Sequence, residues 1–144
     1  MSTFTSAEID FLNDQRLGRL ATVGADGMPH IVPVAVFYDP EAEALVIGAN
    51  ANFGDTVMTK SKKFRDAQSR PKVAVVIDAP SPRILEVRGH AETYLDGGED
   101  VGRRLDAPFR FNQAWIRIRP QRIVAIGING DQFGRSARNV NSET

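Results

Sequence analysis

Apolar residues of this chain fall in short runs separated by turn-forming residues, a pattern typical of antiparallel strands. The predicted strands cover residues 17–23, 31–38, 45–48, 73–77, 83–95 and 114–127. Helical spacing is confined to residues 6–12, 59–68 and, more weakly, 96–105. Because most strands are linked by hairpin turns and the helices are inserted rather than alternating, we predict a mainly β fold, an antiparallel barrel of six strands.

The strand predicted over residues 83–95 shows the clearest alternation of apolar and polar positions. One side of its pleat carries Leu85, Val87, Gly89, Ala91 and Leu95. The other side carries Glu86, Arg88, His90 and Glu92. Side chains of a strand point alternately to its two faces, so the first set is predicted to pack and the second to face water or an interface. In the last predicted strand, Pro120 indicates an edge position or a bulge.

Length and charge limit the possible functions. With 144 residues, 42% of them hydrophobic, the chain can bury a real core, and we predict one domain over residues 1–144. Its polar tail, from about residue 129, is expected to reach over a neighbouring subunit or to be mobile. Lys and Arg balance Asp and Glu at 18 each, which argues against nucleic acid as the main partner. The absence of cysteine excludes thiolate metal sites and thiol nucleophiles.

No targeting or membrane segment is visible in the sequence. Residues 1–5 lack a charged region followed by an apolar one, so no signal peptide is expected. No apolar run approaches the ~20 residues that are needed to cross a bilayer. We therefore expect a cytoplasmic protein with no membrane partner.

The most informative stretch for chemistry is Ser61-Lys62-Lys63, at the start of a basic helix between two apolar strands. A helix start offers free backbone N–H groups and the positive end of the helix dipole. A hydroxyl and two ammonium groups add to these, so the stretch forms a candidate phosphate site. The same residues fit a solvated basic helix face equally well.

Two other places are candidates for ligand binding. Pro33 lacks an N–H and breaks one ladder bond, so its neighbours' backbone groups can face a ligand, although a proline on an edge strand is the simpler interpretation. Trp115, Arg117 and Arg119 share one strand face at a period of two. Two guanidiniums beside an indole can hold a planar anion, or can form an exposed or interface face.

Several catalytic motifs are missing. The sequence contains no Gly-x-Ser-x-Gly, His-Glu-x-x-His, P-loop, paired-carboxylate or Gly-x-Gly-x-x-Gly pattern. If the protein is an enzyme, a bound cofactor therefore carries the chemistry. The two histidines, His30 and His90, are interpreted first as isolated surface residues, and no metal site is expected.

Five segments together resemble the pyridoxamine 5′-phosphate oxidase-like family of split barrels. They are LGRLATVG (residues 17–24), DG-x-PHIVPV (26–34), SKKFRD (61–66), EVRG-x-AE (86–92) and IRI-x-P-x-RIV (116–124). The branch they resemble most is the deazaflavin-dependent oxidoreductases, which use coenzyme F420. The resemblance covers about residues 6–140 and implies a six-stranded antiparallel split β-barrel of the FMN-binding type.

The resemblance also implies a homodimer with two cofactor sites at its interface. The implied cofactor-binding residues are Val32, Pro33, Val34, Ile47, Gly48, Ala49, Ser61, Lys62, Lys63 and Trp115. The lysines would grip the cofactor phosphate, and the first three residues would lie along the isoalloxazine-like ring by main-chain contacts. The next three would pass close to the ring or ribityl chain, where small residues allow near approach. The tryptophan and the tail would come from the partner subunit.

The implied activity is transfer of a hydride from reduced coenzyme F420 to an electron-poor double bond of a small organic substrate. FMN is the alternative cofactor and would give an oxidase or flavin reductase. A non-catalytic protein that binds flavin or haem is a third possibility, with His30 or His90 as the axial haem ligand. The arginine and histidine pattern that holds the substrate phosphate in pyridoxal-forming members has no match near the C-terminus, which argues against pyridoxamine phosphate oxidation.

Overall fold

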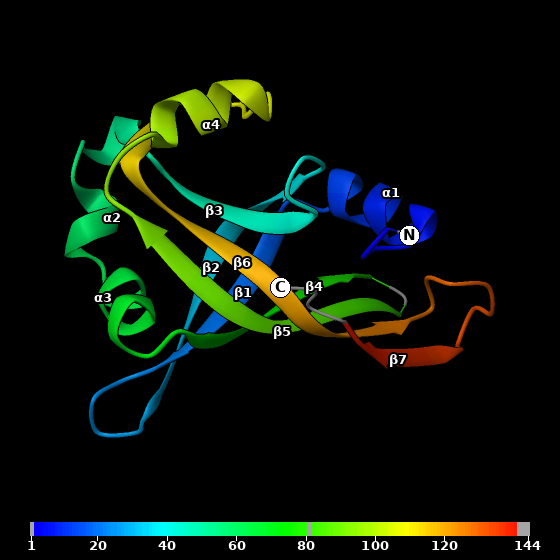
Figure 1. Cartoon of the computed structure of the whole chain (residues 1–144). Coiled ribbons are helices and arrows are strands. Elements are labelled where there is room, and N and C mark those ends of the chain that lie inside the picture. Colours follow the sequence, from blue (N-terminus) through cyan, green and yellow to red (C-terminus); the bar gives the residue numbers. More distant parts are fainter. Residues whose placement is uncertain (1, 81, 141–144) are drawn as a thin grey trace.

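A computed structural model describes residues 2–80 and 82–140 (Figure 1). Its helices are α1 (Ser6–Asp14), α2 (Val57–Lys60), α3 (Lys62–Ser69) and α4 (Gly98–Arg104), with a 3-10 turn η1 at Ala51–Phe53. Its strands are β1 (Leu17–Val23), β2 (Pro29–Asp39), β3 (Ala44–Asn50), β4 (Lys72–Ala79), β5 (Arg83–Tyr94), β6 (Phe111–Ile126) and β7 (Arg135–Asn139). The predicted mainly β fold with inserted helices is confirmed.

The strands pair antiparallel in the order β3-β2-β1-β4-β5-β6-β7. β3 also pairs with β6, which closes six strands into a barrel and confirms the predicted six-stranded antiparallel barrel. One edge of β6 serves two neighbours: its first half, as far as Ile118, pairs with β3, whereas residues 122–126 pair with β7. β7 is therefore a seventh strand that lies outside the closed ring.

The barrel is split between β2 and β3. Their pairing covers only four residue pairs, from Val36 with Ile47 to Asp39 with Ala44. Before Val36, β2 pairs with β1 alone, and this β1–β2 hairpin projects from the barrel (Figure 1). Beyond Ile47, β3 continues along β6 alone. We call the gap between residues 29–35 of β2 and the end of β3 the split.

Two hydrophobic clusters lie on opposite faces of β3. Leu45 and Ile47 belong to the main core, which is made by inward-facing residues of the ring and includes Phe64 of α3. Val46, between them, points the other way and packs with the buried ring of Phe111 in a second cluster beside α4. Since both faces of β3 are buried, its sequence is a continuous apolar run without alternation.

The predicted irregularity at Pro120 is confirmed as a bulge in β6. Arg88 pairs with Arg122 and the next residue, Gly89, pairs with Pro120, so β6 holds one extra residue here. A Cβ at Gly89 would lie 2.3 Å from the carbonyl oxygen of Arg119, so only glycine fits against the bulge. The alternation predicted for β5 is confirmed as far as Ala91.

Leu95, by contrast, was predicted to pack with that buried side, and this is wrong. β5 ends at Tyr94, and Leu95 is exposed beyond it. The strand ends because the chain turns through Gly97, which has a left-handed backbone (φ 91°), to begin α4.

A buried ion pair ties the C-terminal strand to the first helix. Two guanidinium nitrogens of Arg138 donate to the fully buried carboxylate of Glu8, at 2.6 and 2.9 Å. Arg138 also donates to the carbonyl of Thr3, and the amide of Asn129 donates to Glu8 at 2.7 Å. We call these four residues the N–C clasp. Residues 135–139 of the predicted tail are thus held as a strand against β6 of their own chain, and the part of the tail beyond Val140 lies outside the described residues.

The clasp gives the fold a defined dependence on pH. Burial alone would raise the pKa of the Glu8 carboxyl, but hydrogen bonds from Arg138, Asn129 and the Thr5 N–H, with the charge of Arg138, lower it below its usual value. Because the folded-state pKa is depressed, the clasp stabilises the fold at pH values above the unfolded-state pKa. This stabilisation is lost as the pH falls through the folded-state pKa.

We expect Arg138→Met to lower the free energy of unfolding by about 3 kcal/mol at pH 7, because Glu8 stays buried without its countercharge. Urea unfolding followed by circular dichroism measures the loss, which should shrink as the pH falls through the depressed pKa of Glu8. Arg135→Met, at an exposed position on the same strand, is the matched control and should change stability by less than ~0.5 kcal/mol. Equal losses in the two variants would show that the clasp does not contribute to the free energy of unfolding beyond an ordinary surface arginine.

Candidate functional site

Three segments predicted to bind the cofactor adjoin the split. Residues 32–34 lie on the open part of β2, and residues 47–49 lie where β3 leaves β2. The helix that carries the third segment, α3, contacts the hairpin, because Thr22 of β1 donates to Asp66 at 3.1 Å and Arg70 donates to the Val23 carbonyl at 2.7 Å. Two of the three segments thus border the split, and the helix that begins with the third packs against the hairpin beside it.

Pro33 lies at the open edge of β2, opposite Arg19 of β1. Val36 donates its N–H to the Arg16 carbonyl at 2.8 Å, and backbone groups along an antiparallel strand turn to alternate sides. The backbone groups of Pro33 and Ala35 therefore face away from β1, toward the split. A proline at this position costs the β1–β2 ladder no hydrogen bond, while the Pro33 carbonyl and the Ala35 N–H are directed to the opening.

The small residue at Gly48 is explained by packing within the fold. A Cβ at this position would lie 2.4 Å from the Phe111 ring, which therefore needs the space. Its neighbours Ile47 and Ala49 are both buried, so only the backbone of this segment can meet a ligand.

Ser61 separates two helices rather than lying within one. Its extended backbone (φ −78°, ψ 147°) ends α2 and caps α3, so the continuous helix predicted over residues 59–68 is wrong. The Ser61 hydroxyl donates to the Met58 carbonyl at 2.6 Å and accepts from the Phe64 N–H at 3.3 Å. This capping uses the hydroxyl within the protein, whereas the N–H groups of the first turn, at Lys62 and Lys63, have no partner inside the helix.

The two lysines of α3 have different surroundings. Lys62 pairs with the buried carboxylate of Asp66 at 3.2 Å, and Arg70 lies 3.6 Å from the same carboxylate. Burial alone would raise the pKa of Asp66, but hydrogen bonds from Lys62 and Thr22 and the two nearby positive charges lower it. Lys62 is thus neutralised inside the protein.

Lys63 is half-buried, and burial lowers the pKa of its ammonium group. Among residues 2–80 and 82–140, no carboxylate lies within ion-pair distance of it. A partly desolvated charge without a counterion favours an anionic ligand, because the ligand restores the lost electrostatic stabilisation. Lys63 is therefore the better candidate of the two for binding a phosphate.

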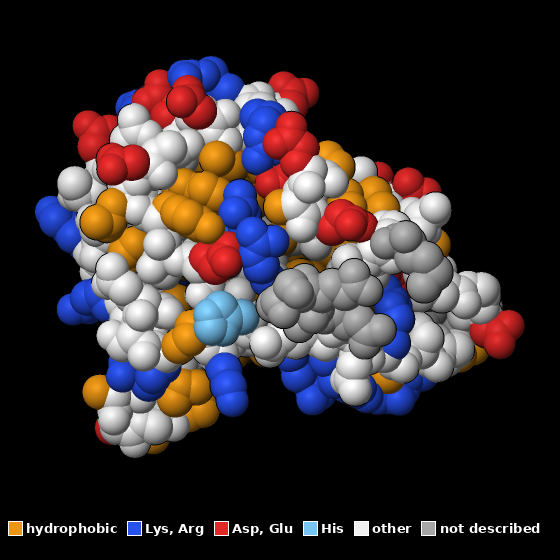
Figure 2. Space-filling view, viewed as in Figure 1, with side chains coloured by type: hydrophobic (Ala, Val, Ile, Leu, Met, Phe, Trp, Pro, Cys, Tyr) orange, Lys and Arg blue, Asp and Glu red, His pale blue; other side chains and the backbone are white. Residues whose placement is uncertain are grey.

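Trp115 differs from the other candidate residues because its ring is packed inside the protein. Its side chain is only 5% exposed, it stacks on Tyr94 at a centroid distance of 4.5 Å, and its N–H donates to the Asp96 carbonyl at 2.9 Å. The guanidinium of Arg117 covers both rings, at 5.0 Å from the Trp115 centroid. The predicted sharing of one face by Trp115, Arg117 and Arg119 is confirmed, since Arg117 and Arg119 both meet Glu92 of β5. Figure 2 shows charged and apolar side chains mixed over β5 and β6.

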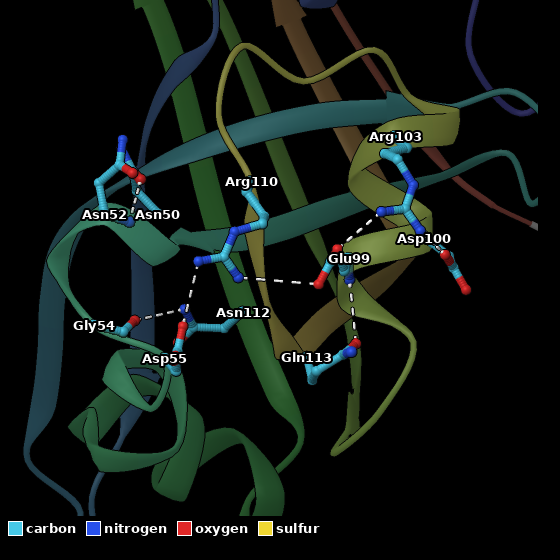
Figure 3. A network of polar contacts seen from close by, with 10 residues as sticks. All are labelled: Asn50, Asn52, Gly54, Asp55, Glu99, Asp100, Arg103, Arg110, Asn112 and Gln113. Carbon is cyan, nitrogen blue, oxygen red and sulfur yellow. Dashed lines mark hydrogen bonds and ion pairs between the residues drawn. The ribbon is translucent and has the colours of Figure 1, made fainter.

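Sequence reasoning missed a polar network beyond the end of β3 (Figure 3). The guanidinium of Arg110, directly before β6, lies 3.4 Å from Asp55 and 3.9 Å from Glu99 of α4. Next to it the buried side chain of Asn112 accepts a hydrogen bond from the Met58 N–H at 2.9 Å. Three segments distant in sequence meet here, and no spacing or motif could have joined them.

Metal and membrane features are absent from the described part of the chain. Within residues 2–80 and 82–140, no group of three histidine, cysteine, aspartate or glutamate side chains is arranged to hold a metal ion. None of the described helices has the length and apolar character needed to span a membrane. Of the two histidines, His30 is half-buried and His90 is exposed.

The chain is similar to proteins of known name along nearly its whole length. The sequence model of the family described as pyridoxamine 5′-phosphate oxidase matches residues 4–126. A 5a,11a-dehydrotetracycline/5a,11a-dehydrooxytetracycline reductase of Streptomyces rimosus subsp. rimosus is 37% identical over 147 residues, covering 97% of this chain and 95% of the relative.

Two solved structures illustrate the likeness of fold. The HupZ protein of Group A Streptococcus superposes with a TM-score of 0.70 at 20% identity, covering 91% of this chain and 99% of that one. A pyridoxamine 5′-phosphate oxidase-related, FMN-binding protein of Nostoc punctiforme PCC 73102 gives a TM-score of 0.64 at 12% identity, covering 99% of each chain. At these identities the two likenesses show the fold alone.

We expect Asp66→Asn to lower the free energy of unfolding by about 2 kcal/mol, because Lys62, Arg70 and the buried Thr22 hydroxyl lose a charged acceptor. Urea unfolding at pH 7 measures this loss. Asp78→Asn, which breaks an exposed pair with Arg19, is the control and should cost less than ~1 kcal/mol. A loss at Asp66 no larger than the loss at Asp78 would mean that the buried carboxylate does not organise the start of α3.

Proposed function

This chain belongs to the pyridoxamine 5′-phosphate oxidase family, and from this premise we propose that it is a reductase that transfers a hydride from reduced coenzyme F420 to an electron-poor double bond of a small organic substrate. The observation that carries the proposal is the 37% identity to a reductase along 97% of the chain. An oxidoreductase activity follows from this likeness more directly than the identity of the cofactor does.

A deazaflavin supplies a hydride and reacts poorly with oxygen, so it suits a reductase better than an oxidase. In the reduction the substrate gains the hydride from the cofactor, which is oxidised, and a proton that we assign to solvent. The protein's share of this chemistry is binding and orientation, in line with the absence of a catalytic motif.

We assign the cofactor phosphate to the first turn of α3. The uncompensated ammonium of Lys63 supplies charge there, and the N–H groups of Lys62 and Lys63 supply hydrogen-bond donors. The ammonium group of Lys62 keeps its bond to Asp66, so Lys62 contributes its backbone N–H rather than its charge. Ser61 contributes by fixing the start of the helix.

The ring of the cofactor is assigned to the split. The Pro33 carbonyl and the Ala35 N–H would meet its polar edge, with Val32 and Val34 on either side of Pro33, and the backbone from Ile47 to Ala49 would close the other side. Binding through the main chain would orient the ring without requiring particular side chains. A ring held between the two strands would also be shielded from water on both sides.

FMN remains the alternative cofactor, because a phosphate site of this kind accepts either molecule. Oxidation of pyridoxamine phosphate is not proposed. No histidine follows His90 in this sequence, so the arginine and histidine pattern that would hold that substrate's phosphate has no match here.

We further propose that two copies form a homodimer through the outer face of the β1–β2 hairpin. Leu17, Val23, Pro29, Ile31 and Pro33 project from this face and all are exposed. A projecting hairpin with so many exposed apolar residues is costly in water and typical of an interface. A second copy there would also cover the split.

We expect the apo-protein to bind coenzyme F420 more tightly than FMN, with Lys63→Gln weakening binding by about 1–3 kcal/mol through loss of a charge-assisted contact. Titration followed by Trp115 fluorescence or calorimetry measures both affinities, with haem as a third ligand. Lys60→Gln removes a neighbouring exposed charge and is the control. Preference for FMN would assign the protein to the flavin-using branch, and binding of neither would remove the enzyme proposal.

We expect Ile31→Glu to turn a dimer into a monomer, because a carboxylate at the centre of the apolar face would be buried without a partner. Analytical ultracentrifugation measures the mass. Phe133→Glu, which changes an equally exposed apolar residue in the loop before β7, is the control and should leave the dimer intact. A monomeric wild-type protein, or a dimeric Ile31→Glu variant, would contradict the assigned interface.

A further inference from the structure

A cavity of about 290 Å³ lies between α4 and the loop that leads into β6. Its wall is largely apolar, because Gly102 exposes no side chain and Ala107, Pro108 and Phe109 face the space. Three charged residues complete the lining: Glu99, Arg103 and Arg110. The cavity therefore combines an apolar wall with a charged rim that holds two guanidiniums and one carboxylate.

The arginines around α4 are held with very different strength. Arg104 makes a bidentate pair with the buried Asp39, at 2.8 and 2.9 Å, and Arg103 bonds Glu99 at 2.9 Å and also pairs with Asp100. Arg110 is different. Its contacts with Asp55 and Glu99 measure 3.4 and 3.9 Å, which is too long for strong charge-assisted bonds.

The side chain of Arg110 is thus available to another anion. It is 53% exposed, and its nearer partner, Asp55, is 80% exposed, so water already weakens their attraction. The more distant partner, Glu99, is bonded through its other oxygen to Arg103. Figure 3 shows the guanidinium of Arg110 lying between the carboxylates of Asp55 and Glu99.

The backbone of Arg110 is, in contrast, fixed close to the split. Its carbonyl accepts the N–H of Ala51 at 2.8 Å, and Ala51 begins η1 directly after the β3 segment that borders the split. The same turn carries Phe53, an aromatic side chain that is 81% exposed. The Arg110 end of the cavity is therefore joined by one backbone hydrogen bond to η1, which follows the β3 segment that borders the split.

We propose that this cavity binds the part of the substrate remote from the reacting bond, and that this part is a largely apolar organic group that carries an anionic substituent such as a carboxylate. Arg110 is the residue that binds the anionic group, by exchanging Asp55 for the ligand. The apolar wall takes the hydrocarbon body. The role as a substrate site rests on the proposed reductase function, but binding of such an anion does not require that function.

The test uses naphthalene-2-carboxylate and its neutral analogue naphthalene-2-carboxamide, titrated into the cofactor-free protein and followed by NMR of the backbone amides. The two probes share their apolar body and differ in charge. We expect the carboxylate to bind more tightly, with shifts concentrated at residues 107–110. Equal affinity for the two probes, or shifts centred elsewhere, would overturn the assignment.

Three variants separate binding from structure. Arg110→Gln should weaken carboxylate binding about tenfold and leave carboxamide binding unchanged, because only the charged contact is lost. Asp55→Asn should strengthen carboxylate binding about twofold, because it removes the exposed competitor. Arg135→Gln lowers the net charge equally at a distant position and should have no effect. If Arg110 is only a structural clasp between loop and helix, its replacement will lower the unfolding temperature without changing the preference between the probes.

The outcome does not depend on the cofactor titration. Carboxylate binding through Arg110 in a protein that binds neither F420 nor FMN would leave the anion site standing and remove the reductase proposal. Cofactor binding without a preference for the carboxylate would remove the anion site and leave the reductase proposal standing.

Discussion

The early end of the β2–β3 ladder is the constraint on which the rest of the structure depends. The pairing stops at Val36 of β2 and Ile47 of β3. Residues before Val36 pair only with β1, and residues after Ile47 pair only with β6. A complete ladder would have used the backbone groups of both strands and closed the barrel to ligands. Because pairing stops, main-chain donors and acceptors of β2 face an opening, and the connection through η1, α2 and α3 is free to cross beside it. Pro33 at this edge makes the arrangement permanent, since it cannot donate to a returning strand.

Charge in this small protein is divided between groups that hold the fold and groups left for ligands. Lys62 and Arg104 are each matched to a buried carboxylate. Lys63 follows Lys62 directly and Arg110 lies shortly after Arg104, but neither has a buried carboxylate as a close partner among the described residues. Lys63 is partly buried, and Arg110 makes only long contacts with exposed or shared carboxylates. The first pair fixes helices beside the split, and the second pair marks the two places where we propose that an anion binds. Net neutrality of the whole chain hides this division.

The sequence predicted the barrel well because its signals are local. The alternation along β5 as far as Ala91 and the irregularity at Pro120 each depend on neighbouring residues alone, and the structure agrees with both. The start of α3 was also visible from Ser61, although the separate α2 was not. The tail and the Arg110 network could not be predicted, because Arg138 meets Glu8 across 130 residues and Arg110 meets Asp55 across 55. Such pairs depend on how the strands are ordered in space, and local patterns in a single sequence do not predict this order.

The N–C clasp affects how the protein folds during its synthesis. On the ribosome, α1 is made first, and the carboxylate of Glu8 stays hydrated until Arg138 emerges, almost the whole chain later. The barrel also waits, because β3 needs β6 to close. Long-range closure of this kind slows folding and leaves apolar strand surface uncovered during synthesis. Folding of the nascent chain is thus completed only after Arg138 has left the exit tunnel, and truncation before Arg138 would leave the Glu8 carboxylate without its countercharge.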